Sequence, residues 1–172
     1  ETNNSEDNDL IIVNLLRKSA IENELQILPV ALSVNNFLST NPGVCGSNTF
    51  IRLKTLLQAG GFDEALPATV DRDFFVRVFL QKPKYKTINK HLVTQYTDID
   101  RPRVTINDEK KKCSLHIFFY KYRYLMNATV KELFFNRAKT LFNISREELE
   151  EIPLSISKTI KQEIQFLNKG KY

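Results

Sequence analysis

This chain of 172 residues has little of what holds small cross-linked folds together: two cysteines, two histidines, one methionine and no tryptophan. Cys45 and Cys113 lie far apart, and only Cys113 has a nearby histidine, His116, so the roughly four clustered ligands of a structural zinc site are missing. Five glycines and six prolines exclude a collagen-like or linker-like chain. No apolar run approaches the ~18 residues that a membrane-spanning helix needs.

The sequence also does not predict a secretory signal peptide, because no positively charged start is followed by an apolar run. Scarce cysteine is typical of a reducing compartment. We therefore expect a cytoplasmic protein, with peripheral contact to a membrane surface as an alternative.

Apolar residues are nevertheless plentiful. Hydrophobic residues make up 42% of the chain and charged residues 26%, with twelve phenylalanines and six tyrosines. These proportions are those of a globular protein. A chain of this length buries roughly two thirds of the surface that its unfolded form exposes. The composition therefore predicts one domain, or one and a half, with an aromatic core.

Charge is distributed unevenly along the chain. Residues 1–100 hold 10 lysines and arginines against 12 acidic residues, whereas residues 101–172 hold 15 against 8. A basic carboxyl-terminal segment is either a solvated face or a surface that attracts nucleic acid, an anionic membrane or a phosphorylated substrate. The charge alone leaves these alternatives open.

The first part of the chain has the pattern of a mixed α/β segment. Strands are predicted at Leu10–Val13 and Lys86–Tyr96, and an edge strand or extended loop over residues 25–32. Turn residues predict irregular structure over residues 35–46 and a polar loop over residues 97–108.

Helices are expected around and after these strands. A short strand or turn from Asn48 leads into a helix closed by Gly60-Gly61, and an apolar stripe predicts a helix over residues 71–81. Beyond residue 108 the chain reads as helical to its end. The expected elements are a helix over 109–126, two helices that start at the capping boxes Thr129-x-x-Glu132 and Ser145-x-x-Glu148, and a last helix over 155–167.

Three short motifs follow one another between residues 43 and 97. They are Gly46-Ser-Asn-Thr-Phe-Ile-Arg52, then Gly60-Gly61-Phe62-Asp63-Glu64-Ala-Leu66, then Asp71-Arg-Asp-Phe-Phe-Val-Arg77. In order and spacing, this set resembles the second half of a family 2, inverting, GT-A fold glycosyltransferase. In that family a glycine-led segment with an arginine precedes a GGFDE motif and then an acidic pair followed by an arginine.

The resemblance implies a fold class and a domain division. Residues 1–108 would form the carboxyl-terminal half of a GT-A domain, a Rossmann-like nucleotide-diphospho-sugar transferase fold, and residues 109–172 a basic helical appendage. Because the family's donor-binding half finds no counterpart before residue 43, we expect the chain to be part of a longer enzyme and to be inactive when isolated.

The resemblance also implies the reaction. A sugar would pass with inversion from a nucleotide-diphosphate donor to a hydroxyl of a glycan, lipid-linked or protein acceptor. Such a transfer needs a carboxylate that takes the acceptor's proton, and Asp71 occupies the family's catalytic-base position. The start of a helix would favour its ionised form. Asp71 is also a candidate for a simple helix N-cap, and the two roles are compatible.

Residues around this base would contact substrate by the same resemblance. The first motif would line the donor sugar and acceptor side with Gly46, Ser47 and Asn48. The second would border the acceptor pocket with Gly61, Phe62, Asp63 and Glu64. For Phe62 a plain core position is the alternative, and for Asp63 a turn that bonds its own backbone.

The third motif adds two further residues to the predicted site. Asp73 and Arg77 are four apart, so on a helix they face one another and would support the loop around Asp71. Val70 stands where the family usually has an acidic residue, so one of its paired carboxylates is missing.

A divalent metal, manganese or magnesium, would bridge the donor diphosphate. We expect most of its ligands to lie outside this chain. Asp98, in a late Asp-x-Asp pair, is the candidate ligand within it.

A noncatalytic binding module is the alternative function. Three lysines at 110–112 precede Phe118, Phe119, Tyr120, Tyr122 and Tyr124, an interleaving of cations and rings found in single-strand binders. The partner would be nucleic acid, an acidic protein or an anionic membrane surface, with nucleic acid the least expected because no known nucleic-acid motif accompanies the rings.

Overall fold

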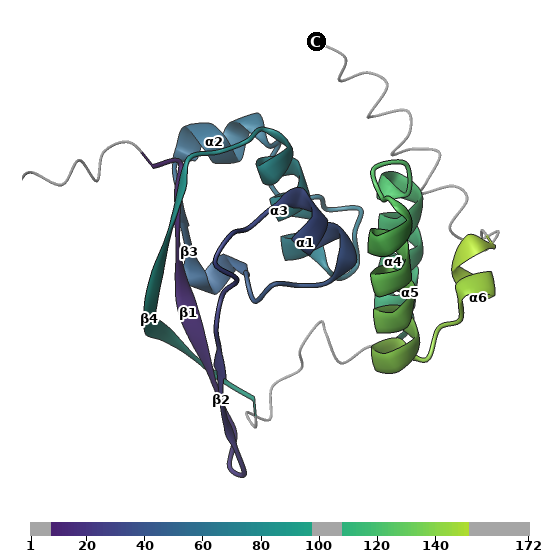
Figure 1. The fold of residues 1–172 in the computed structure, drawn as a ribbon, viewed down its shortest axis with the longest axis horizontal. Coiled ribbons are helices and arrows are strands. Elements are labelled where there is room, and N and C mark those ends of the chain that lie inside the picture. The colour runs from purple at the N-terminus through teal and green to yellow at the C-terminus, as the bar shows by residue number, and fades with distance from the viewer. Residues whose placement is uncertain (1–7, 98–107, 152–172) are drawn as a thin grey trace, which may run out of the picture.

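The computed structural model describes residues 8–97 and 108–151 (Figure 1). Its sheet has four strands: β1 (Leu10–Lys18), β2 (Asn23–Gln26), β3 (Thr49–Ile51) and β4 (Tyr85–Tyr96). β1 pairs antiparallel with β3 along its first half and with β2 along its second half, and parallel with β4 along its whole length. The fold is therefore mixed α/β, as predicted.

β1 lies at the centre because its sequence suits burial. Leu10 and Ile12 are at most 1% exposed and face the helices, where they join the core. The predicted strand over 10–13 is confirmed, and it extends five residues further because β2 folds back on it as a hairpin. Of the residues 25–32, predicted as an edge strand or an extended loop, only the first two are strand, since β2 ends at Gln26 and the rest form a loop.

Helices cover one face of this sheet in successive layers. Figure 1 shows α1 and α3 against the sheet, α4 and α5 beyond them, and α6 outermost. Their bounds are α1 Val34–Ser39, α2 Leu53–Gln58, α3 Val70–Leu80, α4 Asp108–Tyr122, α5 Ala128–Phe142 and α6 Arg146–Glu150. A 3₁₀ turn, η2 (Gly46–Asn48), precedes β3. No helix within residues 8–97 and 108–151 is long and apolar enough to cross a bilayer.

Several predicted helices are confirmed and three details are wrong. Residues 35–46 are not all irregular, because Ser33 and Asn36 form a capping box that starts α1 and Phe37 and Leu38 are fully buried. α4 ends four residues before the predicted limit. The N-cap of α5 is Asn127, whose side chain accepts from the Val130 backbone N–H, and not the predicted Thr129.

Other boundaries agree with the sequence. The predicted capping box at Ser145 and Glu148 starts α6. α3 and β4 match the predicted helix and strand to within a residue. The predicted loop over 97–108 and last helix over 155–167 lie almost entirely outside the described residues.

One hydrophobic core runs through both parts of the chain. The same cluster of buried residues extends from Leu10 in β1, through Phe37 in α1 and Phe75 in α3, to Phe118 in α4 and Leu149 in α6. Helix α5 packs on α1 as well as on α4. The predicted division at residue 108 thus crosses a continuous core, and α4 to α6 bury apolar surface that the sheet and α3 share.

Candidate functional site

The first and third motifs meet at the start of α3. The backbone of Gly46, in η2, lies beside the Asp71 carboxylate and lowers its pKa. A Cβ atom at position 46 would lie 3.7 Å from Asp71 Oδ1, an ordinary van der Waals contact. The η2 turn and the start of α3, which are far apart in the sequence, therefore lie side by side at Gly46 and Asp71.

Asp71 lies in the first turn of α3 and is half-buried. Burial raises the pKa of its carboxyl group above 3.8, and the nearby Gly46 backbone lowers it by less. The N-cap of α3 is Thr69, so Asp71 is not the cap. The expected stabilisation of the ionised form is thus outweighed by desolvation, which leaves Asp71 a stronger base than an exposed aspartate.

The backbone just before Asp71 is strained. Thr69 has a φ of 58° and a ψ of 19°, the left-handed region that β-branched residues seldom adopt. Its Oγ1 atom is buried and has no hydrogen-bond partner within the described part of the chain. Such strain is held by surrounding contacts and concentrates at functional sites.

Within η2 the three predicted residues differ in accessibility. Gly46 and Ser47 are exposed. The Asn48 side chain is 0% exposed: its Oδ1 accepts from the Cys45 N–H at 2.8 Å, and its Nδ2 donates to Val13 O at 2.9 Å and Gly43 O at 2.8 Å. Asn48 therefore holds the loop in shape, and Gly46 and Ser47 present its surface.

The second motif forms a turn beside α3. Gly60 and Gly61 have φ angles of 77° and 67° at the end of α2, as predicted for a helix closed by glycine. Phe62 is 47% exposed, and its ring centroid lies 4.7 Å from that of Phe74. Phe62 is therefore not a core residue: one part of its ring packs on α3 and the rest faces solvent.

A buried ion-pair network fixes α3. The predicted pair is present: Arg77 Nε and Nη2 donate to Asp73 Oδ2 at 2.9 and 2.8 Å. Asp73 is 0% exposed, and its Oδ1 accepts from Tyr122 Oη at 2.6 Å and lies 2.9 Å from Lys121 Nζ. Arg77 also donates to the Ala59 carbonyl at the end of α2.

Lys121 joins this network to the second motif. Its Nζ lies 2.7 Å from Asp63 Oδ2, while Asp63 Oδ1 accepts from the Ala65 N–H at 3.0 Å. Asp63 is thus both the predicted turn residue and a charge partner, whereas Glu64 is exposed. We refer to Asp63, Asp73, Arg77, Lys121 and Tyr122 as the α3–α4 network.

Lys121 and Tyr122 were not predicted as part of the site. They lie about fifty residues from their partners, and nothing in the local pattern of α4 indicates which side chains face α3. Arg72 was missed as well. It is 5% exposed and donates through Nε and Nη2 to Phe37 O and Leu38 O, both at 2.5 Å.

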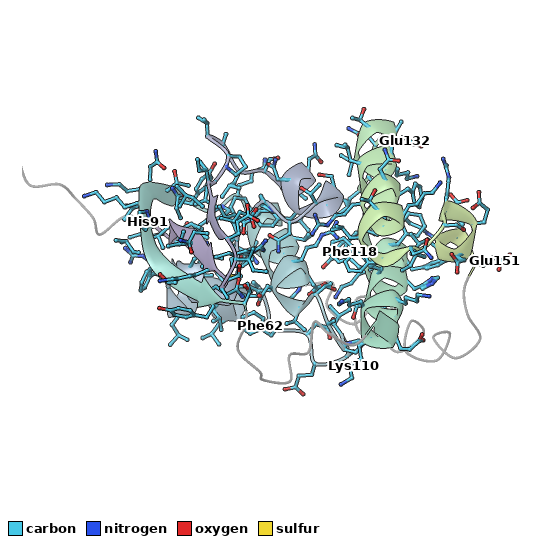
Figure 2. The ribbon with its side chains drawn as sticks, turned by 90° about the horizontal axis from the view of Figure 1, so that it is seen from below. Phe62, His91, Lys110, Phe118, Glu132 and Glu151 are labelled. Atoms are coloured by element: carbon cyan, nitrogen blue, oxygen red, sulfur yellow. The ribbon has the colours of Figure 1, made fainter. Side chains whose placement is uncertain are left out.

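The aromatic residues of α4 are largely in the core. Phe118, Phe119 and Tyr122 are at most 4% exposed, and Phe118 lies between α3 and the α4–α5 layer (Figure 2). Tyr124 is 73% exposed, just beyond the end of α4. The buried rings are therefore not available to stack on bases.

The described residues do not fit a divalent metal. Within residues 8–97 and 108–151 no three His, Cys, Asp or Glu side chains are grouped to hold one. Asp98, the predicted ligand, lies outside the described residues. No step through a metal is derived from this chain.

Comparison of the chain with protein-family models, with curated proteins and with solved structures finds no significant match.

Proposed function

We propose that this chain carries the catalytic base and the acceptor side of an inverting glycosyltransferase that uses a nucleotide-diphosphate sugar. The observation that carries the proposal is the meeting of the three motifs: the Gly46 backbone contacts Asp71, and the Phe62 ring packs on Phe74 of the same helix. The α3–α4 network then holds α3 and the 60–66 turn together.

The chemistry assigned to Asp71 is proton removal from an acceptor hydroxyl. Its half-buried position raises its pKa, so the carboxylate takes a proton more readily than an exposed one would. The partly exposed Phe62 ring offers an apolar surface for a sugar face beside it. In this proposal the donor nucleotide and its divalent metal bind largely to residues outside this chain, in a GT-A fold of which it forms the carboxyl-terminal part.

The test measures sugar transfer and nucleotide-sugar binding by the full-length protein with manganese, and by this chain alone. Asp71→Asn should lower turnover by at least ~100-fold, the usual contribution of a general base, while thermal stabilisation by donor persists. Glu22→Gln, on the exposed β1–β2 turn, is the matched control and should keep full turnover. Full activity of Asp71→Asn would reject the base assignment, and turnover by the chain alone would reject the partial-site proposal.

A further inference from the structure

β4 is a long edge strand: among the described strands it pairs only with β1. β4 spans 12 residues and pairs with β1 from Tyr85 to Tyr96, with two register shifts that leave Asn89, Lys90 and Leu92 without a partner on β1. On its other side no strand lies within the described part of the chain. Such an edge presents a row of backbone N–H and C=O groups that can pair with another strand.

This edge carries charge of one sign. Between residues 82 and 97 the sequence has no aspartate or glutamate. We define the basic edge as Lys82, Lys86, Lys90 and His91, all of which are exposed. Figure 2 shows His91 on the side of the molecule away from the helical layers.

Among the described residues, neighbouring elements add charge of both signs beside it. At the far end of β4, β1 contributes Arg17 and Lys18 beside Gln95 and Tyr96. Glu24 on β2 lies 3.6 Å from Arg17 and so balances that residue alone. At the near end, Asp9 accepts from the Lys84 backbone N–H at 2.7 Å.

Apolar side chains accompany the charges. Leu92 is 63% exposed, and Ile88 and Val93 are half-buried along the same strand. A strand added to a sheet edge gains affinity from its backbone hydrogen bonds and specificity from its side chains. Alternating acidic and apolar residues would complement what β4 presents.

We infer that the basic edge binds an acidic, extended segment of another protein, added to the sheet as a strand beside β4. A second copy of this chain is disfavoured as the occupant, because two basic edges would place like charges opposite one another. Opposite charge across an added strand attracts instead.

The probe is a fluorescein-labelled ten-residue peptide that alternates glutamate with valine. Fluorescence anisotropy should show binding that weakens with added salt, and weaker binding of the lysine–valine peptide by at least tenfold. The same acidic peptide with an N-methyl group on every backbone nitrogen keeps its charge but has no N–H to donate to β4 from either of its edges. It should lose most of its affinity.

Lys86→Glu with Lys90→Glu should weaken binding by at least tenfold, while Lys131→Glu with Lys139→Glu on α5, an equal change of charge, should leave it unchanged. Lys86, Lys90 and Lys139 are exposed and Lys131 is half-buried, and circular dichroism checks that both variants fold.

Equal binding of the N-methylated peptide would overturn strand addition, and so would equal loss in the α5 variant. No binding of the acidic peptide would overturn the inference outright. Tighter binding of oligodeoxythymidine at the same lysines would assign the edge to nucleic acid, and concentration-dependent dimers lost in the β4 variant would assign it to a second copy. Neither result depends on the proposed transferase activity.

Discussion

The two sides of α3 hold buried charge in different ways. On one side Arg72 is bound by the Phe37 and Leu38 carbonyls of α1 and lies 4.2 Å from the ring centroid of Phe118 in α4 and 5.2 Å from that of Phe134 in α5. On the other side Asp73 is bound by cations and a hydroxyl in the α3–α4 network. One side stabilises a cation with dipoles and rings, and the other balances opposite charges.

These two environments predict that removing the charge of Arg72 destabilises the fold less than removing the charge of Asp73. Arg72 caps the last carbonyls of α1, where the negative end of the helix dipole favours a cation. Even so, burial and nearby Arg137 lower the pKa of Arg72 to about 9, so its charge is costly to keep. Asp73 is the reverse case, because its removal leaves Arg77 and Lys121 without their shared carboxylate.

Removing the α4 and α5 partners of both Arg72 and Asp73 should have the largest effect on stability. A chain ended at residue 107 loses α4 and α5, and with them Lys121, Tyr122, Phe118 and Phe134. We expect no cooperative unfolding transition in urea or on heating, because Asp73, Arg72 and the apolar faces of α1 and α3 become exposed. A cooperative unfolding transition of this shortened chain would show instead that residues 1–107 are an independent folding unit.

Asp73→Ala should be the most damaging single substitution of the comparison. Breaking a buried pair by removing one partner costs about 3–5 kcal/mol, because the remaining charges stay buried. Urea unfolding followed by circular dichroism measures the loss. Glu64→Ala, at an exposed site in the neighbouring turn, should change stability by less than ~0.5 kcal/mol.

Arg72→Met should cost less than Asp73→Ala, about 1–2 kcal/mol. The substitution leaves two carbonyls without their donor, but it also removes the desolvation cost of a buried cation. Methionine can keep contact with the Phe118 and Phe134 rings. A loss larger than that of Asp73→Ala, measured in the same urea titration, would mean that carbonyls and rings hold charge better than a counter-ion does.

Asp71→Asn should have the smallest effect on stability, and in the opposite direction. The folded pKa of Asp71 is raised above 3.8, so stability falls as pH rises from that value through the folded pKa, and the full cost is present above it. The variant should therefore be more stable near pH 7 by at most ~1 kcal/mol, because solvent screens a half-buried group. The gain should vanish below pH ~3.8, and a gain that persists there would assign it to something other than ionisation.

Local pattern was enough to predict much of the fold. β-branched runs, an apolar stripe and paired glycines predicted β1, α3, β4 and the end of α2. α1 was missed because its six residues carry turn-forming asparagines, and only burial of Phe37 and Leu38 makes it a helix. Short helices of this kind depend on tertiary packing, which no local window contains.

In the site, too, contacts between residues close in sequence were predicted and contacts between distant residues were not. Spacing along one helix predicted the Asp73–Arg77 pair, because residues four apart face one another. The partners from α4 could not be predicted, since Lys121 reaches Asp63 across 58 residues and Tyr122 reaches Asp73 across 49. The glycosyltransferase assignment itself remains a prediction from the three motifs.

The parallel pairing of β1 with β4 also has a consequence for the order of folding. Residues 19–84 lie between the two strands, and Asn14 meets Asn89 across 75 residues. Closing so long a loop costs entropy before any hydrogen bond of the pair forms, so parallel pairing of this kind is intrinsically slow. The β1–β2 hairpin and the helices between can form locally first. We therefore expect β4 to join the sheet late, and within the described residues this last strand is also the one with no strand on its outer edge.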